Sequence, residues 1–202
     1  MVEHYFTRSP TTSVMAGLIR CRLKGHDFEF LTISGVFSPR GIDNGTRLLI
    51  ESMSLPKGGS VLDLGCGYGP VGIVAARLWP MLEVWMTDLN ERAIELTKEN
   101  AKRNGVENVI VVQGHIYEPV DGKAFDAIVS NPPISAGLRK VVGPLISGAV
   151  DHLVEKGSLQ VVVQSNKGGR ALSSLMEKAF GNVEVLSRRS GYRVLKAEKA
   201  KA

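Results

Sequence analysis

Apolar and amphipathic segments alternate along most of the chain from residue 60 onward. The five most apolar runs predict buried strands: residues 60–64, 83–87, 108–112, 125–130 and 158–164. The segments between them predict helices at residues 70–79, 90–104, 138–154 and 169–180. Strands and helices that alternate at this spacing predict an α/β fold, with a mostly parallel sheet that helices cover on both faces.

The two ends of the chain differ from this pattern. Residues 182–186 and 192–197 predict two further strands, and only residues 187–191 join them, so we expect an antiparallel hairpin. Residues 26–33 alternate between polar and apolar side chains and suggest an edge strand. A loop over 34–44 and a short helix over 45–53 follow it. We expect residues 1–45 to be an N-terminal extension that packs on the sheet of the main domain, residues 46–202.

Single residues mark several element boundaries. Pro70 stands at a permitted first-turn position of its helix. Asn90 is a good N-cap, and Gly105 ends the same helix. Gly157 is expected to close the helix over 138–154.

Length and composition fit one globular domain. The 202 residues are 44% hydrophobic and 22% charged, no apolar run approaches the ~20 residues of a membrane span, and no signal-peptide pattern begins the chain. Because no such run is present, we expect no membrane contact. Cys21 and Cys66 lie far apart without metal-ligand spacing, so we expect no metal site and a reducing cytoplasm. The net charge of +5 permits an RNA partner but fits a solvated surface equally well. We expect a monomer or weak dimer.

Four residues after the run at 125–130 carry the strongest chemical signal. Asn131-Pro132-Pro133-Ile134 stops a strand, because proline donates no backbone hydrogen bond. Stiffened carbonyls beside an asparagine form a cluster of acceptors that suits an amino group. An ordinary strand-ending turn fits the same residues.

A glycine-rich turn predicts a ligand site at the end of the first parallel strand. Gly65, Gly67 and Gly69 follow Asp63 with G-x-G-x-G spacing, which differs from the dinucleotide and phosphate-loop patterns and favours a nucleoside-like ligand. Asp88 ends the next strand, where a carboxylate can accept hydrogen bonds from both ribose hydroxyls. Asp88 can also cap the following helix, and the glycines can serve a tight turn. Asp63 can contact a ligand's amino group directly or through water.

In this order the motifs resemble those of the class I S-adenosylmethionine-dependent methyltransferases, over about residues 35–197. The resemblance implies a Rossmann-like, doubly wound, seven-stranded, mostly parallel sheet and S-adenosylmethionine as cofactor. Asn-Pro-Pro marks members that methylate planar nitrogens. Residues 35–46 and 190–195 resemble the small-subunit rRNA guanine-N2 methyltransferases, in a single-module form most like small archaeal members.

The resemblance implies three sets of site residues. The catalytic residues are Asn131, Pro132, Pro133 and Ile134. The cofactor-binding residues are Asp63, Gly65, Cys66, Gly67, Gly69, Asp88, Leu89, His115, Ile116 and Asn131. The candidate substrate-binding residues are Phe37, Arg40, Asp43, Lys140, Arg188 and Arg189. The four basic ones are candidates for RNA phosphates because of their charge, and a solvated surface position fits each of them as well.

Two positions depart from the family pattern. Ile134 stands where an aromatic residue usually stacks on the target base, and Phe37, Tyr5 or Phe6 could supply a ring instead. The region around His115 lacks the acid that the family often places near the adenine, and His115 fits a surface position equally well. The main prediction is methylation of a guanine amine in rRNA of the small ribosomal subunit. The alternatives are a protein glutamine methyltransferase, a methyltransferase of another RNA or DNA base amine, and a non-catalytic cofactor- or RNA-binding module.

Overall fold

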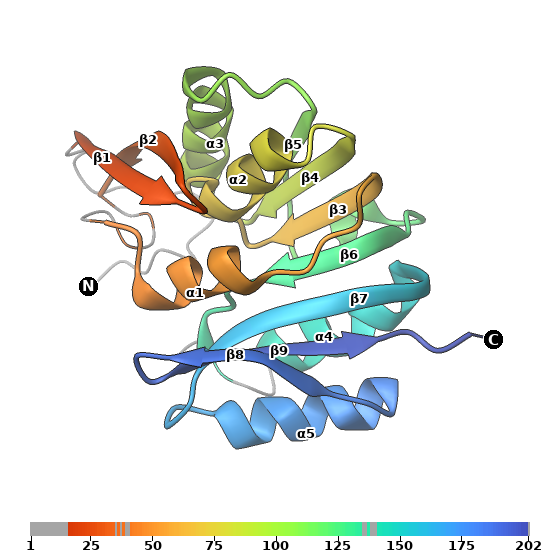
Figure 1. Ribbon diagram of the computed structural model, residues 1–202. Coiled ribbons are helices and arrows are strands. Elements are labelled where there is room, and N and C mark those ends of the chain that lie inside the picture. Colours follow the sequence, from red (N-terminus) through yellow and green to blue (C-terminus); the bar gives the residue numbers. More distant parts are fainter. Residues whose placement is uncertain are drawn as a thin grey trace.

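A seven-stranded sheet forms the centre of the protein in a computed structural model that describes residues 16–34, 36, 38, 41–134, 137 and 141–201 (Figure 1). In spatial order its strands are β5 (Val109–Gln113), β4 (Leu82–Asp88), β3 (Gly59–Leu64), β6 (Phe125–Ser130), β7 (Leu153–Gln164), β9 (Tyr192–Glu198) and β8 (Glu184–Arg189). The first five pair in parallel, and β9 is antiparallel to both of its neighbours. The doubly wound, mostly parallel sheet with an antiparallel C-terminal hairpin is therefore confirmed.

Helices cover both faces of this sheet (Figure 1). One face carries α1 (Asn44–Ser52), α2 (Pro70–Leu78) and α3 (Glu91–Arg103), and the other carries α4 (Gly143–Asp151), α5 (Gly169–Phe180) and the 3₁₀ turn η1 (Glu118–Val120). Successive strand residues point to opposite faces, so β3 contributes Val61 to the first core and Leu62 to the second. Burial on both faces explains the unbroken apolar runs in the sequence.

The boundary signals in the sequence act as expected for α2, α3 and α5. Pro70 begins α2, directly after Gly69 with φ of 92°. Asn90 caps α3, its side chain accepting a hydrogen bond from Arg92 N at 3.0 Å. The expected helix over 169–180 is α5, and Gly181 ends it in the left-handed conformation.

The helix expected over 138–154 was wrong at its C-terminal end. Helix α4 ends at Asp151, and β7 already begins at Leu153, so Gly157 lies inside a strand. A Cβ on Gly157 would stand 2.9 Å from the carbonyl oxygens of both Phe125 and Val154. Gly157 therefore permits a close backbone approach at a register irregularity between β6 and β7.

The C-terminal hairpin is longer than expected. Strand β8 runs to Arg189, and only Ser190 and Gly191, both with positive φ, form the turn. This two-residue turn suits the twist of a hairpin. The expected loop over 187–191 is therefore mostly strand. Asn182 lies before β8 and pairs its side-chain amide with the backbone of Glu198 instead.

A second, two-stranded sheet precedes α1. The strand expected over 26–33 is β2 (His26–Ile33), but its partner is β1 (Ala16–Leu23), which the polar–apolar pattern did not reveal. The hairpin adds no strand to the seven-stranded sheet, and it lies beside α3 (Figure 1). Its Phe28 and Phe30 are buried in the same core as α2 and α3. The division of the chain at residue 45 stays a prediction.

Candidate active site

A cavity opens where β3, β4 and β6 end, next to the point at which the strand order reverses. Open α/β sheets bind ligands at this position. Most of the predicted site residues line the cavity: Asp43, Asp63, Gly65, Cys66, Gly67, Asp88, Leu89, His115, Ile116, Asn131, Pro132 and Pro133. The fold thus brings the glycine loop, the acid after β4 and the Asn-Pro-Pro segment to one place.

Four other predicted residues lie outside the cavity wall as the structure describes it. Gly69 is the N-cap of α2, and its φ of 92° requires glycine for the turn that starts the helix. Ile134 packs, partly buried, against the core of the α4–α5 face. Arg188 and Arg189 lie on β8, exposed to solvent. The other three lie outside the described residues: Phe37, Arg40 and Lys140.

Backbone hydrogen bonds hold the glycine loop against β4. The N–H groups of Gly65 and Cys66 both donate to the Thr87 carbonyl, at 2.8 and 2.9 Å. Gly65 and Gly67 have φ of 77° and 60°, and a Cβ on either would meet nothing within 4 Å. The backbone conformation therefore requires glycine at these two positions, and the packing around them does not.

Asp88 both supports the loop and faces the cavity. Its Oδ2 accepts from Gly67 N at 2.9 Å, and its Oδ1 accepts from Asn90 N at 2.8 Å. Burial raises the pKa of Asp88 above its usual value, and these backbone N–H groups oppose that rise. Backbone N–H groups of Gly67, Leu89 and Asn90 use three of the four lone pairs of the carboxylate, so capping the next helix still leaves an acceptor for a hydroxyl.

Asp63 is 2% exposed and accepts a hydrogen bond from Gly72 N at 2.8 Å. Burial raises the pKa of Asp63 to about 7, the Gly72 N–H lowers it, and the negative charge of Asp88 adds a smaller rise. A buried carboxylate that titrates near neutral pH marks a place where a bound cation would be strongly favoured.

Asn131 is held in one orientation by a residue that the motif analysis did not single out. Its Nδ2 donates to the hydroxyl of Thr46 on α1 at 2.9 Å. Thr46 is buried and also lines the cavity, and the side chain of Asp43 caps α1 by accepting from Gly45 N and Thr46 N. The Asn131 Oδ1 is thereby left as an acceptor. The position of Thr46 in the segment 35–46 was the only sequence signal for this role.

The Pro132 carbonyl is partly engaged within the chain. It accepts a hydrogen bond from Ile134 N at 2.9 Å, in a turn that follows β6. One lone pair of the carbonyl oxygen remains. Ser130, just before the motif, ties the end of β6 to β3 by donating from its hydroxyl to the Leu64 carbonyl at 2.7 Å.

Leu89, His115 and Ile116 line the part of the cavity that lies beyond the ends of β4 and β5. Ile116 adopts φ of 49°, an unusual value for a β-branched residue. His115 lines the cavity, yet its side chain is 54% exposed and its Nδ1 stands 3.9 Å from Glu118 Oε1. The surface position considered for His115 and a place at the cavity mouth are therefore both observed.

Cys66 is a packed thiol. It is buried, and burial raises its pKa well above the usual value, with the charges of Asp88 and Asp63 adding to the effect. Its Sγ stands 3.7 Å from Thr97 Oγ1. A nucleophilic cysteine requires a lowered pKa, so the environment of Cys66 opposes that role.

The wall suits S-adenosylmethionine, the cofactor that the sequence implies. Asp88 offers acceptors for ribose hydroxyls, the apolar Leu89 and Ile116 can flank a flat ring, and Asp63 can face an ammonium group. The hydroxyl of Thr87, also a cavity-lining residue, is buried without a hydrogen-bond partner among the described residues. A polar ligand would satisfy such a group.

Among the described residues, no group of three or more His, Cys, Asp and Glu side chains could hold a metal ion. Within the same ranges, no helix has both the length and the apolar character needed to span a membrane.

Comparison with known proteins identifies the family. The methyltransferase small domain model matches residues 27–196. The protein named "Uncharacterized protein YbxB" of Bacillus subtilis (strain 168) is 39% identical over 201 residues, which are 98% of this chain and 100% of that protein. Ribosomal RNA small subunit methyltransferase C of Serratia proteamaculans (strain 568) is 34% identical over 88% of this chain and 50% of its own length. The chain thus spans about half the length of the small subunit methyltransferase C relatives that it matches.

Among solved structures, the 16S rRNA N2 G1207 methyltransferase (RsmC) of T. thermophilus, in complex with AdoMet and guanosine, matches with a TM-score of 0.82. The two are 26% identical, over 94% of this chain and 52% of that one. The fold is that of the class I S-adenosylmethionine-dependent methyltransferases. The chain belongs to the methyltransferase small domain family, so the resemblance predicted from its motifs is confirmed. S-adenosylmethionine, the cofactor predicted from the sequence, is the cofactor of this class.

Proposed function

We propose that this chain transfers a methyl group from S-adenosylmethionine to the exocyclic amine of a guanine in rRNA of the small ribosomal subunit. The observation that carries the proposal is the Asn131 amide, which Thr46 holds at the cavity wall with its Oδ1 left as an acceptor. The names of the relatives support the substrate, and the RsmC structure is a complex with AdoMet and guanosine.

The cofactor would lie between the glycine loop and the ends of β3 and β4. Asp88 would accept hydrogen bonds from its ribose hydroxyls, and Asp63 would stabilise its amino group, whose positive charge favours the ionised carboxylate. When bound, S-adenosylmethionine supplies an electrophilic methyl group on a sulfonium. The residues of this chain would hold that methyl group near Asn131.

The chain's own contribution to the chemistry would be to position the amine. The guanine amine is a weak nucleophile because its lone pair is delocalised into the ring. Asn131 Oδ1 and the remaining lone pair of the Pro132 carbonyl can each accept one N–H, which favours a pyramidal nitrogen aimed at the methyl group. The nitrogen–methyl bond would form as the sulfur–methyl bond breaks, leaving a thioether. The same acceptors would stabilise the positive charge on nitrogen until one amine proton passes to water.

An exposed basic surface near the cavity offers contacts for RNA phosphates. It consists of four exposed basic side chains that form no ion pair within the described part of the chain: Lys167, Arg170, Arg188 and Arg189. Ser165 N donates to Gly191 O at 2.8 Å, which joins the end of β7 to the hairpin turn after Arg189. Strand β7 is parallel to β3 and β6, so the carboxyl ends of all three strands lie on the same side of the sheet. This basic surface therefore flanks the cavity.

Methyl transfer to several substrates in parallel tests the proposal. Purified protein would be incubated with labelled S-adenosylmethionine and small ribosomal subunits, protein-free rRNA, tRNA, DNA or a release factor, with Asn131→Ala as the inactive control. We expect label in the rRNA alone, as N2-methylguanine on nucleoside analysis. Label in tRNA, DNA or the release factor would move the assignment to that substrate. No label anywhere, with S-adenosylhomocysteine still bound, would favour a binding module.

A further inference from the structure

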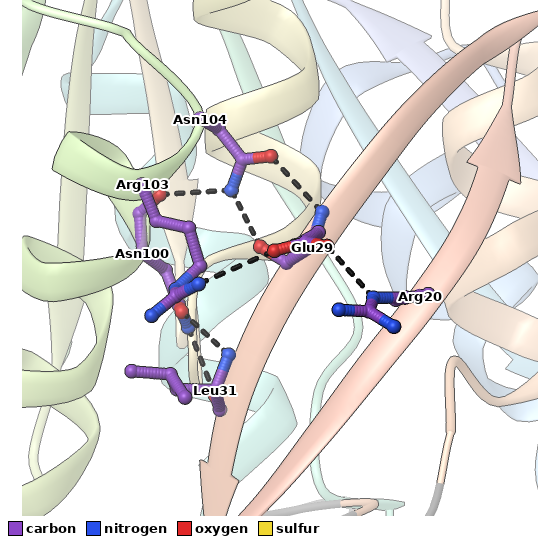
Figure 2. A network of polar contacts seen from close by, with 6 residues as sticks. All are labelled: Arg20, Glu29, Leu31, Asn100, Arg103 and Asn104. Atoms are coloured by element: carbon purple, nitrogen blue, oxygen red, sulfur yellow. Dashed lines mark hydrogen bonds and ion pairs between the residues drawn. The ribbon is translucent and has the colours of Figure 1, made fainter.

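Asn100 of α3 and Asn104, which caps the C-terminus of that helix, hold the free edge of β2 (Figure 2). Asn100 Oδ1 accepts from Leu31 N at 2.7 Å, and its Nδ2 donates to Leu31 O at 3.0 Å. One helical turn later, Asn104 Oδ1 accepts from Glu29 N at 3.2 Å, and its Nδ2 donates to Glu29 O at 2.7 Å. The two side-chain amides thus pair with β2 as a neighbouring strand would, and they dock the N-terminal hairpin on the main domain.

The third hydrogen bond of each amide differs. The second proton of Asn100 Nδ2 goes to the carbonyl of Tyr68 in the glycine loop at 2.9 Å. Asn104 Nδ2 donates instead to the Asn100 carbonyl of its own helix at 2.8 Å. The two residues therefore share the docking role, and of the two only Asn100, which is fully buried, also binds the glycine loop.

The glycine loop depends on α3 for its support. Thr97, one turn before Asn100, donates from its hydroxyl to the Gly67 carbonyl at 2.9 Å. Asn100 holds the next carbonyl, that of Tyr68, and the Tyr68 ring packs edge-to-face on Phe30 of β2 with centroids 5.9 Å apart. Carbonyls fixed toward α3 leave the opposite surface of Gly65 and Gly67 to the cavity. Without Asn100, the buried Tyr68 carbonyl would lose its partner, and the peptide before Gly69 would be freer to rotate.

We propose that Asn100 is a positioning residue for cofactor binding, which couples the docking of the β1–β2 hairpin to the conformation of the glycine loop. The hairpin contributes no residue to the cavity wall as described. Through Asn100, it would nevertheless raise the affinity for the cofactor, and the bound cofactor would in return stabilise the hairpin, since coupling between two sites is reciprocal. This inference rests on the proposed place of the cofactor in the cavity.

Asn100→Leu and Asn104→Leu form a matched pair that tests it. Each replaces an amide by an apolar side chain of similar size and removes both hydrogen bonds to β2. Circular dichroism and thermal melts would show that both variants fold, with losses of stability of similar size. Titration calorimetry with S-adenosylhomocysteine, well below both melting temperatures, should give a Kd raised about fivefold or more for Asn100→Leu and by less than about twofold for Asn104→Leu.

The outcomes separate this inference from the proposed function. An equal rise in Kd for both variants, or no rise for Asn100→Leu, would overturn the role of Asn100. If the wild type bound no S-adenosylhomocysteine, or if Asp88→Ala bound it as tightly as the wild type, the proposed cofactor position would fail instead.

Hydrogen exchange on the wild-type protein tests the same coupling without a variant. Saturating S-adenosylhomocysteine should slow exchange of the Leu31 N–H, which bonds to Asn100, more than that of the Glu29 N–H, which bonds to Asn104. The amides of β8 and β9 serve as the reference. An equal change at Leu31 and Glu29, or no change at either, would contradict the proposal.

Discussion

Asn131 donates its side-chain amide to the hydroxyl of Thr46 across 85 residues of sequence, at 2.9 Å. This hydrogen bond joins the start of α1 to the end of β6. Thr46 is itself fixed because Asp43 caps α1 through the N–H groups of Gly45 and Thr46. The segment that precedes the first parallel strand therefore sets the orientation of the proposed catalytic amide.

Replacing Thr46 by valine should slow methyl transfer. Valine keeps the shape of threonine but offers no acceptor to Asn131 Nδ2, so the amide can turn its oxygen away from the substrate. We expect kcat to fall about tenfold, with the affinity for S-adenosylhomocysteine nearly unchanged. Thr46→Ser, which keeps the hydroxyl, should retain most of the activity. Wild-type turnover in Thr46→Val would show that the hydrogen bond has no part in catalysis.

Asn131→Ala should remove methyl transfer and leave cofactor binding largely intact. The variant loses the acceptor that holds the amine and stabilises charge on its nitrogen, so we expect kcat to fall by about 100-fold or more. Single-turnover assays with the RNA substrate and calorimetry with S-adenosylhomocysteine would measure the two quantities separately. The role given to Asn131 would be wrong if turnover stayed near the wild-type rate.

Cofactor affinity should weaken as pH falls through 7. Burial raises the pKa of Asp63 to about 7, so the carboxylate is ionised above that pH and protonated below it. Only the ionised form attracts the amino group of the ligand, so Kd for S-adenosylhomocysteine should rise about tenfold between pH 8 and pH 6. Asp63→Asn should bind more weakly at pH 8 and lose most of this dependence. A wild-type Kd that did not vary with pH would exclude contact between Asp63 and the amino group.

The raised pKa of Asp63 has the opposite consequence for stability of the free protein. The folded state holds a proton up to about pH 7, whereas the unfolded chain releases it near the usual aspartate pKa of 3.8. The contribution of Asp63 to the free energy of unfolding therefore falls as pH rises between these values. In thermal melts between pH 5 and pH 8, the melting temperature of the wild type should fall as pH rises toward 7, relative to that of Asp63→Asn. Equal pH dependence of the two melting temperatures would contradict the raised pKa.

Removing charge from the β8 hairpin should weaken RNA binding without affecting the cofactor. For the double variant Arg188→Ala, Arg189→Ala we expect KM for RNA to rise and the slope of log affinity against log salt to become shallower by about one per lost phosphate contact. Lys178→Ala is the control, because Lys178 is also exposed but lies in the last turn of α5, which leads to the start of β8, away from the carboxyl ends of the parallel strands. If Lys178→Ala changed KM for RNA and the salt slope as much as the double variant, RNA binding would depend on the net charge of the protein and not on the β8 arginines.

Sequence patterns predicted best what local chemistry decides. Asn90 and Pro70 begin their helices where expected, because a cap and a fixed φ act within one turn. Gly157 was misread as a helix stop. The close approach of the Phe125 carbonyl, which makes glycine necessary there, comes from a neighbouring strand. Strand β1 was missed because its pairing with β2 and its core contacts form only in the folded hairpin.

The sequence alone determined the alternating α/β architecture, the glycine loop, Asp88 and the Asn-Pro-Pro motif, since period, spacing and residue type carry that information. Only the tertiary structure decided that Thr46 orients Asn131, that Asn100 links β2 to the glycine loop, and that Ile134 packs into the core. These relationships join residues that lie far apart along the chain. Their geometry depends on how helices and strands meet, and no local pattern records it.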